Sequence, residues 1–76
     1  MSRTPVLSEV SGAVWQVLVA VGDPVAEYQE LMIIESMKME IPILAPRAGT
    51  VVEILIGETD AVAAEQTVAW IASDAL

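Results

Sequence analysis

The sequence favours an all-β domain, and three observations support this class. Residues 14–19 and 51–56 are rich in β-branched and aromatic side chains, which is the composition of strands. Each run is followed by a segment that breaks regular structure, at residues 22–24 and 57–60. The two halves of the chain also resemble each other at a constant offset of 37 positions. We therefore predict two related halves that contribute similar strands.

Four shorter apolar segments are the other candidate strands. The segment before the central lysine is apolar at consecutive positions, which fits a strand buried on both faces or part of a helix. Turn signals separate the segments, at Ser11-Gly12 and at residues 45–49. The segments are residues 5–7, 31–35, 41–44 and 68–71.

Local preference leaves a second arrangement open. Residues 26–32 and 61–68 contain many good helix formers, among them alanine, glutamate, glutamine and leucine. Each half of the chain is therefore compatible with a strand followed by a helix. Only the runs at residues 14–19 and 51–56 are firm strands on composition alone.

The internal repeat passes through turns, strands and breakers without a gap. Its matches fall in the same order in both halves, so chance agreement between small apolar residues is a poor explanation. We interpret the repeat as an internal duplication. The identical pairs are Gly12/Gly49, Val14/Val51, Leu18/Leu55, Asp23/Asp60, Val25/Val62, Ala26/Ala63, Gln29/Gln66, Ile34/Ile71 and Ser36/Ser73.

Composition sets limits on function. The 76 residues suit a single domain, 1–76, and contain neither cysteine nor histidine, so we expect no disulfide and no zinc or transition-metal site, and the commonest general base is absent. A calcium site made of carboxylates alone is possible in principle, but no loop has the alternating acids that it needs. The formal net charge of −8 argues against binding to nucleic acid or to anionic membranes. No segment has the pattern of a targeting signal or a membrane span. We expect a cytoplasmic protein that is a monomer when isolated.

Lys38 is the only lysine, and it lies at the centre of the chain. It is flanked by Met37 and Met39, with the acids Glu35 and Glu40 on either side. A lone amine in a small acidic domain is a candidate for covalent modification. The ordinary alternatives are a solvated charge at Lys38 and core-filling methionines beside it.

The segment Glu-Ser-Met-Lys-Met at residues 35–39 resembles the attachment motif of biotinyl domains, usually Glu-Ala-Met-Lys-Met. Residues 22–25 (Gly-Asp-Pro-Val) resemble the turn before that motif. Residues 45–51 (Ala-Pro-Arg-Ala-Gly-Thr-Val) resemble the segment after it. The likeness extends from about residue 6 to residue 71, and the chain is most similar to small free-standing biotin carboxyl carrier proteins.

This resemblance implies biotin attached covalently to Lys38 by a biotin–protein ligase. At a hairpin tip we expect Met37, Met39, Glu35 and Ser36 to be recognised by the ligase. The alternatives are that the methionines position the lysine and that Glu35 and Glu40 are simple surface charges. The domain would be a carrier and not an enzyme, with biotin taking a carboxyl group from a biotin carboxylase to a carboxyltransferase subunit. Because the chain has no histidine to accept the proton of the lysine, the ligase must accept it.

The implied fold is a flattened barrel of two four-stranded antiparallel sheets with quasi-twofold symmetry, and Lys38 at the tip of a β-hairpin. Because the repeat has no gap, we predict that the chain lacks the thumb, a loop inserted between residues 18 and 25 in some family members. The symmetry also predicts that Met1 and Leu76 are neighbours, at the end remote from Lys38. Val51 and Leu55 are expected in the core.

Four positions depart from the family pattern. Ser36 replaces the usual alanine of the motif, a change between two small residues. Tyr28 and Glu65 occupy positions where the family often has a turn glycine, and Thr59 stands in a turn that is commonly Gly-Asp. A residue other than glycine at positive φ is costly, so these three turns are expected to be strained.

Two other functions remain open at this point. A lipoyl domain shares the implied fold and uses a lysine at the same hairpin, but its motif usually reads Asp-Lys-Ala or Asp-Lys-Val. Met37 and Met39 favour biotin over lipoate. An unmodified interaction module is the other alternative, and measurement of intact mass after reaction with ligase and biotin separates all three.

Overall fold

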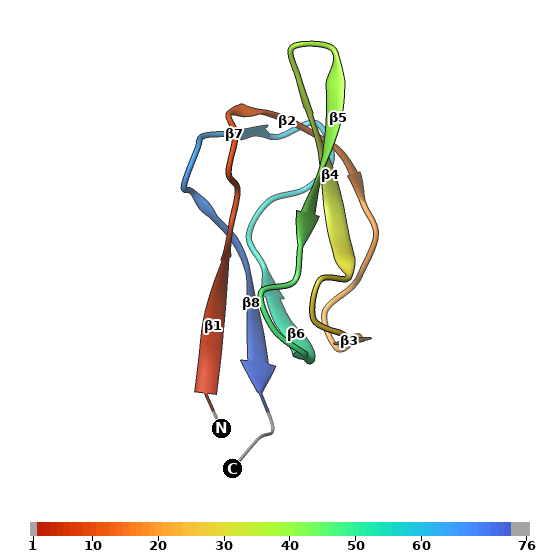
Figure 1. Cartoon of the computed structure of the whole chain (residues 1–76), viewed down its shortest axis with the longest axis vertical. Coiled ribbons are helices and arrows are strands. Elements are labelled where there is room, and N and C mark those ends of the chain that lie inside the picture. The colour runs from red at the N-terminus through yellow and green to blue at the C-terminus, as the bar shows by residue number, and fades with distance from the viewer. Residues whose placement is uncertain (1, 74–76) are drawn as a thin grey trace.

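The computed structural model describes residues 2–73, which form eight strands in two four-stranded antiparallel sheets (Figure 1). This confirms the all-β class and rules out the strand-then-helix arrangement, since no helix occurs among the described residues. The strands are β1 (Ser2–Leu7), β2 (Gly12–Val17), β3 (Pro24–Val25), β4 (Glu30–Ser36), β5 (Met39–Leu44), β6 (Gly49–Ile54), β7 (Ala61–Val62) and β8 (Thr67–Ser73).

The two sheets enclose one apolar core. One sheet has the strand order β1-β8-β6-β3 and the other β5-β4-β2-β7, so each sheet combines strands from both halves of the chain. The long central strands β4 and β8 carry the most deeply buried residues, as expected for strands paired on both sides. The core residues are Val6, Val14, Val25, Leu31, Met32, Ile34, Ile43, Ala45, Val51, Val62, Val68, Ala69 and Ile71.

Strand pairing confirms the quasi-twofold symmetry residue by residue. The pair Ala13↔Glu35 between β2 and β4 corresponds, 37 positions later, to Thr50↔Ala72 between β6 and β8. The turn hydrogen bonds correspond as well. For example, the Tyr28 N–H donates to the Ala45 oxygen at 2.8 Å, and the Glu65 N–H donates to the Ser8 oxygen at 2.6 Å. The two halves therefore repeat their backbone contacts as well as their residues.

Gly12 and Gly49 occupy equivalent sites where two backbones come close together. A Cβ atom on Gly12 would collide with the main-chain oxygen of Glu35, and a Cβ on Gly49 would collide with that of Ala72. Each glycine begins a strand, β2 or β6, that pairs antiparallel with a long central strand, β4 or β8. Glycine is required at both positions for close packing of the backbone.

The predicted bounds of the two firm strands were wrong by two residues. The runs at 14–19 and 51–56 correspond to β2 (Gly12–Val17) and β6 (Gly49–Ile54). A β-bulge in each strand, at Trp15 and at Val52, explains the error. The bulge points two successive side chains outward, so the alternation of buried and exposed positions does not continue unbroken to the end of the apolar run.

The same bulge makes the core assignment of Leu55 wrong. Val51 is 1% exposed and lies in the core as expected, whereas Leu55 is 46% exposed. Leu55 follows the end of β6, where its N–H donates to the oxygen of Val68 at 2.9 Å while its side chain faces outward. Val51 and Leu55 are both apolar, so their residue types alone did not show that one is buried and the other exposed.

The segments rich in helix formers form tight turns instead. At residues 26–29 the Ala26 N–H donates to the Gln29 side-chain oxygen at 3.0 Å, and the Gln29 N–H donates to the Ala26 oxygen at 3.1 Å. Ala63 and Gln66 make the equivalent bonds in the second half. Pairing of the following strands, β4 and β8, outweighs the local helix preference. Strands β3 and β7 were not predicted from the sequence, and each is only two residues long.

The connection between β2 and β3 confirms that the chain has no thumb. It covers residues 18–23, the same length as the equivalent connection, residues 55–60, between β6 and β7. Both connections close with the same hydrogen bond, from Asp23 N–H to Ala20 and from Asp60 N–H to Gly57. No additional loop protrudes between residues 18 and 25.

Met1 and Leu76 lie outside the described residues. The described ends of the chain are paired, since Ser2 lies opposite Ser73 in the register of β1 and β8. In Figure 1 the beginning of β1 and the end of β8 lie at the opposite end of the long axis from the β4–β5 hairpin. The molecule measures 40 × 19 × 18 Å along its principal axes, so the paired ends and the hairpin tip are well separated.

The three turn positions that depart from the family pattern adopt positive φ. The φ angles are 69° at Tyr28, 73° at Thr59 and 68° at Glu65. Thr59 is equivalent to Gly22, which has a φ of 100°. The expected strain is therefore present in these turns, since side chains other than glycine are disfavoured in the left-handed region.

Replacement of Glu65 by glycine is expected to stabilise the domain. Relief of the left-handed strain, partly offset by the greater freedom of the unfolded chain, should give a net gain of roughly 0.5–1 kcal/mol in the free energy of unfolding. Glu65→Ala is the matched control, because alanine keeps the strain and should change stability by less than about 0.5 kcal/mol. Urea unfolding of both variants measures the difference, and equal stabilities would contradict the strain argument.

Candidate functional site

The β4–β5 hairpin projects from one end of the sandwich and ends in a two-residue turn (Figure 1). Ser36 and Met39 form the last strand pair, and Met37 and Lys38 are the two turn residues. Their φ angles of 52° and 65° are those of a type I′ turn. Such turns strongly prefer asparagine and glycine. Methionine and lysine are therefore strained here, which points to a role for their side chains rather than to turn formation.

The Lys38 side chain is exposed and unpaired. Within residues 2–73 the only salt bridge joins Arg3 to Glu53 at 3.1 Å, and no hydrogen bond involves the Lys38 amine. The guanidinium of Arg3 also lies 5.3 Å from the ring centre of Trp70. Lys38 is thus an amine that a partner can approach without first breaking an interaction.

Met37 and Met39 are not core fillers. Met37 is 92% exposed and Met39 is 62% exposed, whereas Met32 on the same hairpin is fully buried. Large apolar side chains held in solvent beside a free amine form a surface that a partner can recognise. This places both residues with Lys38 at the tip, as the sequence predicted, and leaves their role in recognition as a prediction.

Glu35 and Glu40 lie directly opposite each other at the base of the tip. Both side chains are exposed, and like charges that face each other across two strands are mildly destabilising. Lys38 is the only cation on the hairpin, from residue 30 to residue 44. The tip therefore presents one positive charge above two negative ones.

Ser36 ties the hairpin to the body of the domain. Its hydroxyl donates a hydrogen bond of 2.7 Å to the main-chain oxygen of Ser11. The Ser11 hydroxyl in turn accepts a hydrogen bond of 3.1 Å from the Ala64 N–H. The sequence indicated ligase recognition for Ser36 but not its contact with Ser11, nor the contact of Ser11 with Ala64, since these residues are far apart in sequence. Ser11 belongs to a turn signal in the sequence, but no local pattern indicates its contact with Ser36, because strand pairing brings these residues to the hairpin.

Ser36→Ala is expected to loosen the tip while leaving Lys38 available. Loss of one neutral hydrogen bond should lower the free energy of unfolding by about 0.5–1.5 kcal/mol. Amide hydrogen exchange should accelerate in the hairpin around residues 34–41. Ser2→Ala, which removes an exposed hydroxyl at the other end of the molecule, is the matched control. Unchanged exchange in the hairpin of Ser36→Ala would show that the bond does not hold it.

The rest of the hairpin is a rigid support. β4 pairs with β5 on one side and with β2 on the other, and Leu31, Met32 and Ile34 of β4 are all fully buried. The tip is therefore fixed to a strand at the centre of a sheet. Mobility of an attached group would come from the lysine side chain and not from the backbone.

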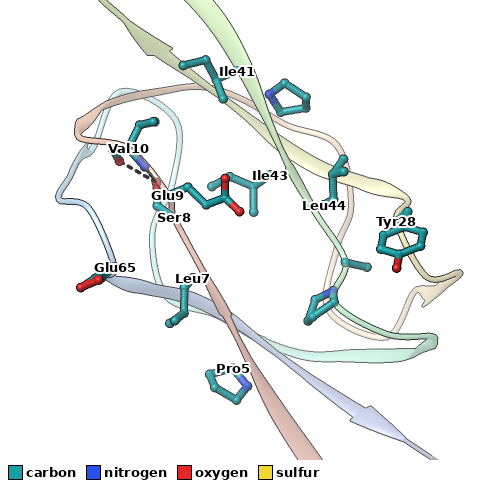
Figure 2. Close-up of a pocket in the computed structure, with 13 residues that line it drawn as sticks. Pro5, Leu7, Ser8, Glu9, Val10, Tyr28, Ile41, Ile43, Leu44 and Glu65 are labelled. Carbon is teal, nitrogen blue, oxygen red and sulfur yellow. Dashed lines mark hydrogen bonds between the residues drawn. The ribbon is translucent and has the colours of Figure 1, made fainter.

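A second feature lies away from the tip. An open cavity of about 470 Å³ lies where the edge strands β1 and β5 approach each other (Figure 2). Pro5 and Leu7 line it from β1, and Pro42 and Leu44 line it from β5. These residues form two pairs related by the repeat. Proline removes a backbone donor from each edge strand, which discourages pairing with another chain. The cavity contains no residue of the hairpin tip.

The described residues offer no alternative chemical centre. Among residues 2–73 no group of three or more acidic, histidine or cysteine side chains could hold a metal ion. The same part of the chain contains no helix that could cross a membrane. The exposed lysine at the tip, with the two exposed methionines beside it, is therefore the candidate site within residues 2–73.

Comparison with known proteins gives matches over most of the chain. The model of a protein family described as "Biotin-requiring enzyme" matches residues 3–71. The Biotin/lipoyl attachment protein of Bacillus subtilis is 48% identical over 52 residues, which cover 68% of this chain and 71% of that protein. The Biotin carboxyl carrier protein of Streptococcus mutans is 52% identical over 50 residues, covering 63% of this chain and 38% of that protein.

Among solved structures, the urea carboxylase of Kluyveromyces lactis contains a similar fold. Its TM-score is 0.89 at 36% sequence identity, and the match covers 95% of this chain but only 6% of that protein. This chain therefore corresponds to most of a small attachment protein and to a small part of a large carboxylase.

Proposed function

The chain belongs to the family of biotin/lipoyl attachment domains found in biotin-requiring enzymes, and on that premise we propose that Lys38 is its attachment residue. The chain is a biotin carboxyl carrier domain with covalently attached biotin. The observation that carries the assignment of the residue is the placement of the only lysine, exposed and unpaired, in a strained two-residue turn.

The geometry of the hairpin tip fits a biotin group attached to Lys38. An amide at the end of the lysine side chain needs space around the amine and a backbone that does not fold back over it. Both conditions are met, since Lys38, Met37 and Met39 are all exposed. When attached, biotin supplies an atom that accepts and releases a carboxyl group. The projecting hairpin would hold a group attached to Lys38 away from the body of the domain.

The residues of the chain support a carrier role and not a catalytic one. Amide formation at Lys38 requires that the ammonium first lose a proton. No histidine is present in the sequence, and the nearest acids, Glu35 and Glu40, sit two or three positions away on the strands. We therefore assign the removal of this proton to the biotin–protein ligase. We also assign recognition by the ligase to Met37, Met39, Glu35 and Ser36.

Two further partners follow from this role. A biotin carboxylase would load the carboxyl group, and a carboxyltransferase would pass it to an acceptor. The likeness to a part of a urea carboxylase supports this assignment. We further propose that residues 1–76 act as one carrier unit and that the isolated domain is a monomer. The net charge of −8 supports the monomer, because it makes copies of the domain repel one another.

Intact-mass measurement tests the attachment directly. The purified chain is incubated with biotin–protein ligase, ATP and biotin, and we expect a mass increase of one biotin, located at Lys38 by peptide mapping. Because amide formation removes one positive charge, the net charge should change from −8 to −9, and isoelectric focusing should show a shift toward the anode. Parallel incubation with lipoate ligase and lipoate is the control. Lipoylation without biotinylation, or no change in mass, would contradict the proposal.

A further inference from the structure

The methionines of the hairpin fall into two classes. Met37 and Met39, at the tip, are 92% and 62% exposed, whereas Met32, on the same strand pair, is 0% exposed. A thioether sulfur that is open to solvent reacts with peroxides to give a sulfoxide, whereas a sulfur packed in a core is shielded. The domain thus carries two reactive methionines and, a few residues away, a protected one for comparison.

Oxidation of the exposed pair should leave the fold intact. Neither Met37 nor Met39 belongs to the apolar core, and their exposed side chains contribute little to packing. The type I′ turn is held by the backbone pair Ser36↔Met39 and by the hydrogen bond of Ser36 to Ser11. Oxidation therefore changes the chemistry of the tip surface without removing an interaction that supports it.

The exposed pair lies immediately beside the amine. Met37 precedes Lys38 and Met39 follows it, and both side chains are exposed, so we expect a partner that encloses the lysine to contact them. A sulfoxide converts a flexible apolar side chain into a polar one. A surface shaped for apolar side chains would then have to bury the new S=O group without a hydrogen-bond partner, which is unfavourable.

We propose that Met37 and Met39 form an oxidation-sensitive site that controls the attachment of biotin to Lys38. Each sulfur takes one oxygen atom from a hydroperoxide: the O–O bond breaks and an S=O bond forms. The sulfur is oxidised by two electrons, and hydrogen peroxide is reduced to water. With both sulfoxides present, the ligase binds the tip poorly and biotin attachment slows. This inference rests on the proposed attachment at Lys38, and the experiment below separates the two.

The first measurement is the site of oxidation. The folded, biotin-free domain is treated with hydrogen peroxide, the peroxide is removed with catalase, and peptides are mapped by mass. We expect one added oxygen on Met37 and one on Met39, with Met32 unchanged. Far-UV circular dichroism should be the same before and after treatment. Oxidation of Met32 in the folded protein to the same extent as Met37 would overturn the structural basis of the proposal.

The second measurement is the rate of biotin attachment by untreated ligase. The initial rate should fall about tenfold or more after oxidation, since a site shaped for an apolar side chain discriminates by about 10–200-fold against changes of one small group. Treatment with methionine sulfoxide reductases A and B, which act on the two sulfoxide epimers, should restore the rate. An oxidised domain that is biotinylated at the original rate would overturn the proposal.

Leucine variants identify the responsible residues. Each variant is its own reference, so only the ratio of rates before and after peroxide is compared. This ratio should be about one for the double variant Met37→Leu/Met39→Leu, because neither residue can then be oxidised. Met32→Leu is the matched control and should remain as sensitive as the parent protein. A double variant that still loses activity after peroxide would place the effect elsewhere. Absence of biotin from the unoxidised parent would instead refute the attachment itself.

Discussion

Lys38→Arg is expected to abolish biotin attachment completely. Arginine preserves the positive charge at the tip, but its guanidinium is not a transferable amine and stays protonated. Because Lys38 is the only lysine of the chain, no other side-chain amine can replace it. The result is therefore binary, and a streptavidin blot or intact-mass measurement after reaction with ligase, ATP and biotin reads it directly.

The structure supplies the controls for this experiment. Lys38 is exposed and makes no salt bridge within residues 2–73, so the variant should have the circular dichroism and unfolding curve of the parent. Ser36→Ala should still be labelled, because it leaves the lysine in place. Biotin found on the arginine variant would refute attachment at Lys38, and peptide mapping would show where it had gone.

Leu31→Ala should be strongly destabilising, and Leu55→Ala should not. Leu31 is 0% exposed at the centre of the core, and truncation of such a residue lowers the free energy of unfolding by about 2–5 kcal/mol. Domains are typically stable by only about 5–15 kcal/mol, so this is a large fraction of the total. Leu55 is 46% exposed, so the same substitution there leaves little cavity and should cost less than about 1 kcal/mol.

Lys38→Ala completes the comparison at the functional tip. It removes an exposed side chain with no partner among the described residues, so it should change the free energy of unfolding by less than about 0.5 kcal/mol. Urea unfolding of the three alanine variants and the parent gives all the differences. A cost at Leu55 equal to that at Leu31 would contradict the outward position of Leu55. A large loss of stability in Lys38→Ala would contradict the conclusion that the Lys38 side chain makes no stabilising contact.

Much of the fold was predictable because the chain repeats itself. Gly12 and Gly49, the apolar runs and the aspartates of the breakers recur at a fixed offset, and the structure repeats its strand pairs at the same offset. The absence of a thumb followed from this repeat, since an inserted loop would have interrupted it. The positive φ of Tyr28, Thr59 and Glu65 followed from a comparison with the family pattern and not from local preference.

Local rules failed where pairing between distant strands decides the structure. The helix formers at residues 26–32 form a turn and the start of β4, because the backbone groups of β4 are satisfied by β2 and β5. The bulges at Trp15 and Val52 shifted the buried face, which made Leu55 an exposed residue rather than a core one. A bulge has no reliable signature in composition, since any residue type can occupy it.

The sequence by itself determined the chemistry of the tip: a single amine, two methionines beside it, and no histidine or cysteine anywhere in the chain. Only the tertiary structure decided how these groups are presented. It placed Met37 and Lys38 in left-handed conformations at a two-residue turn and exposed the methionines. It also brought the main-chain oxygen of Ser11 within hydrogen-bond distance of the Ser36 hydroxyl. The physical reason is that exposure and strain depend on contacts between strands far apart in sequence, whereas the identity of a reactive group depends on one residue alone.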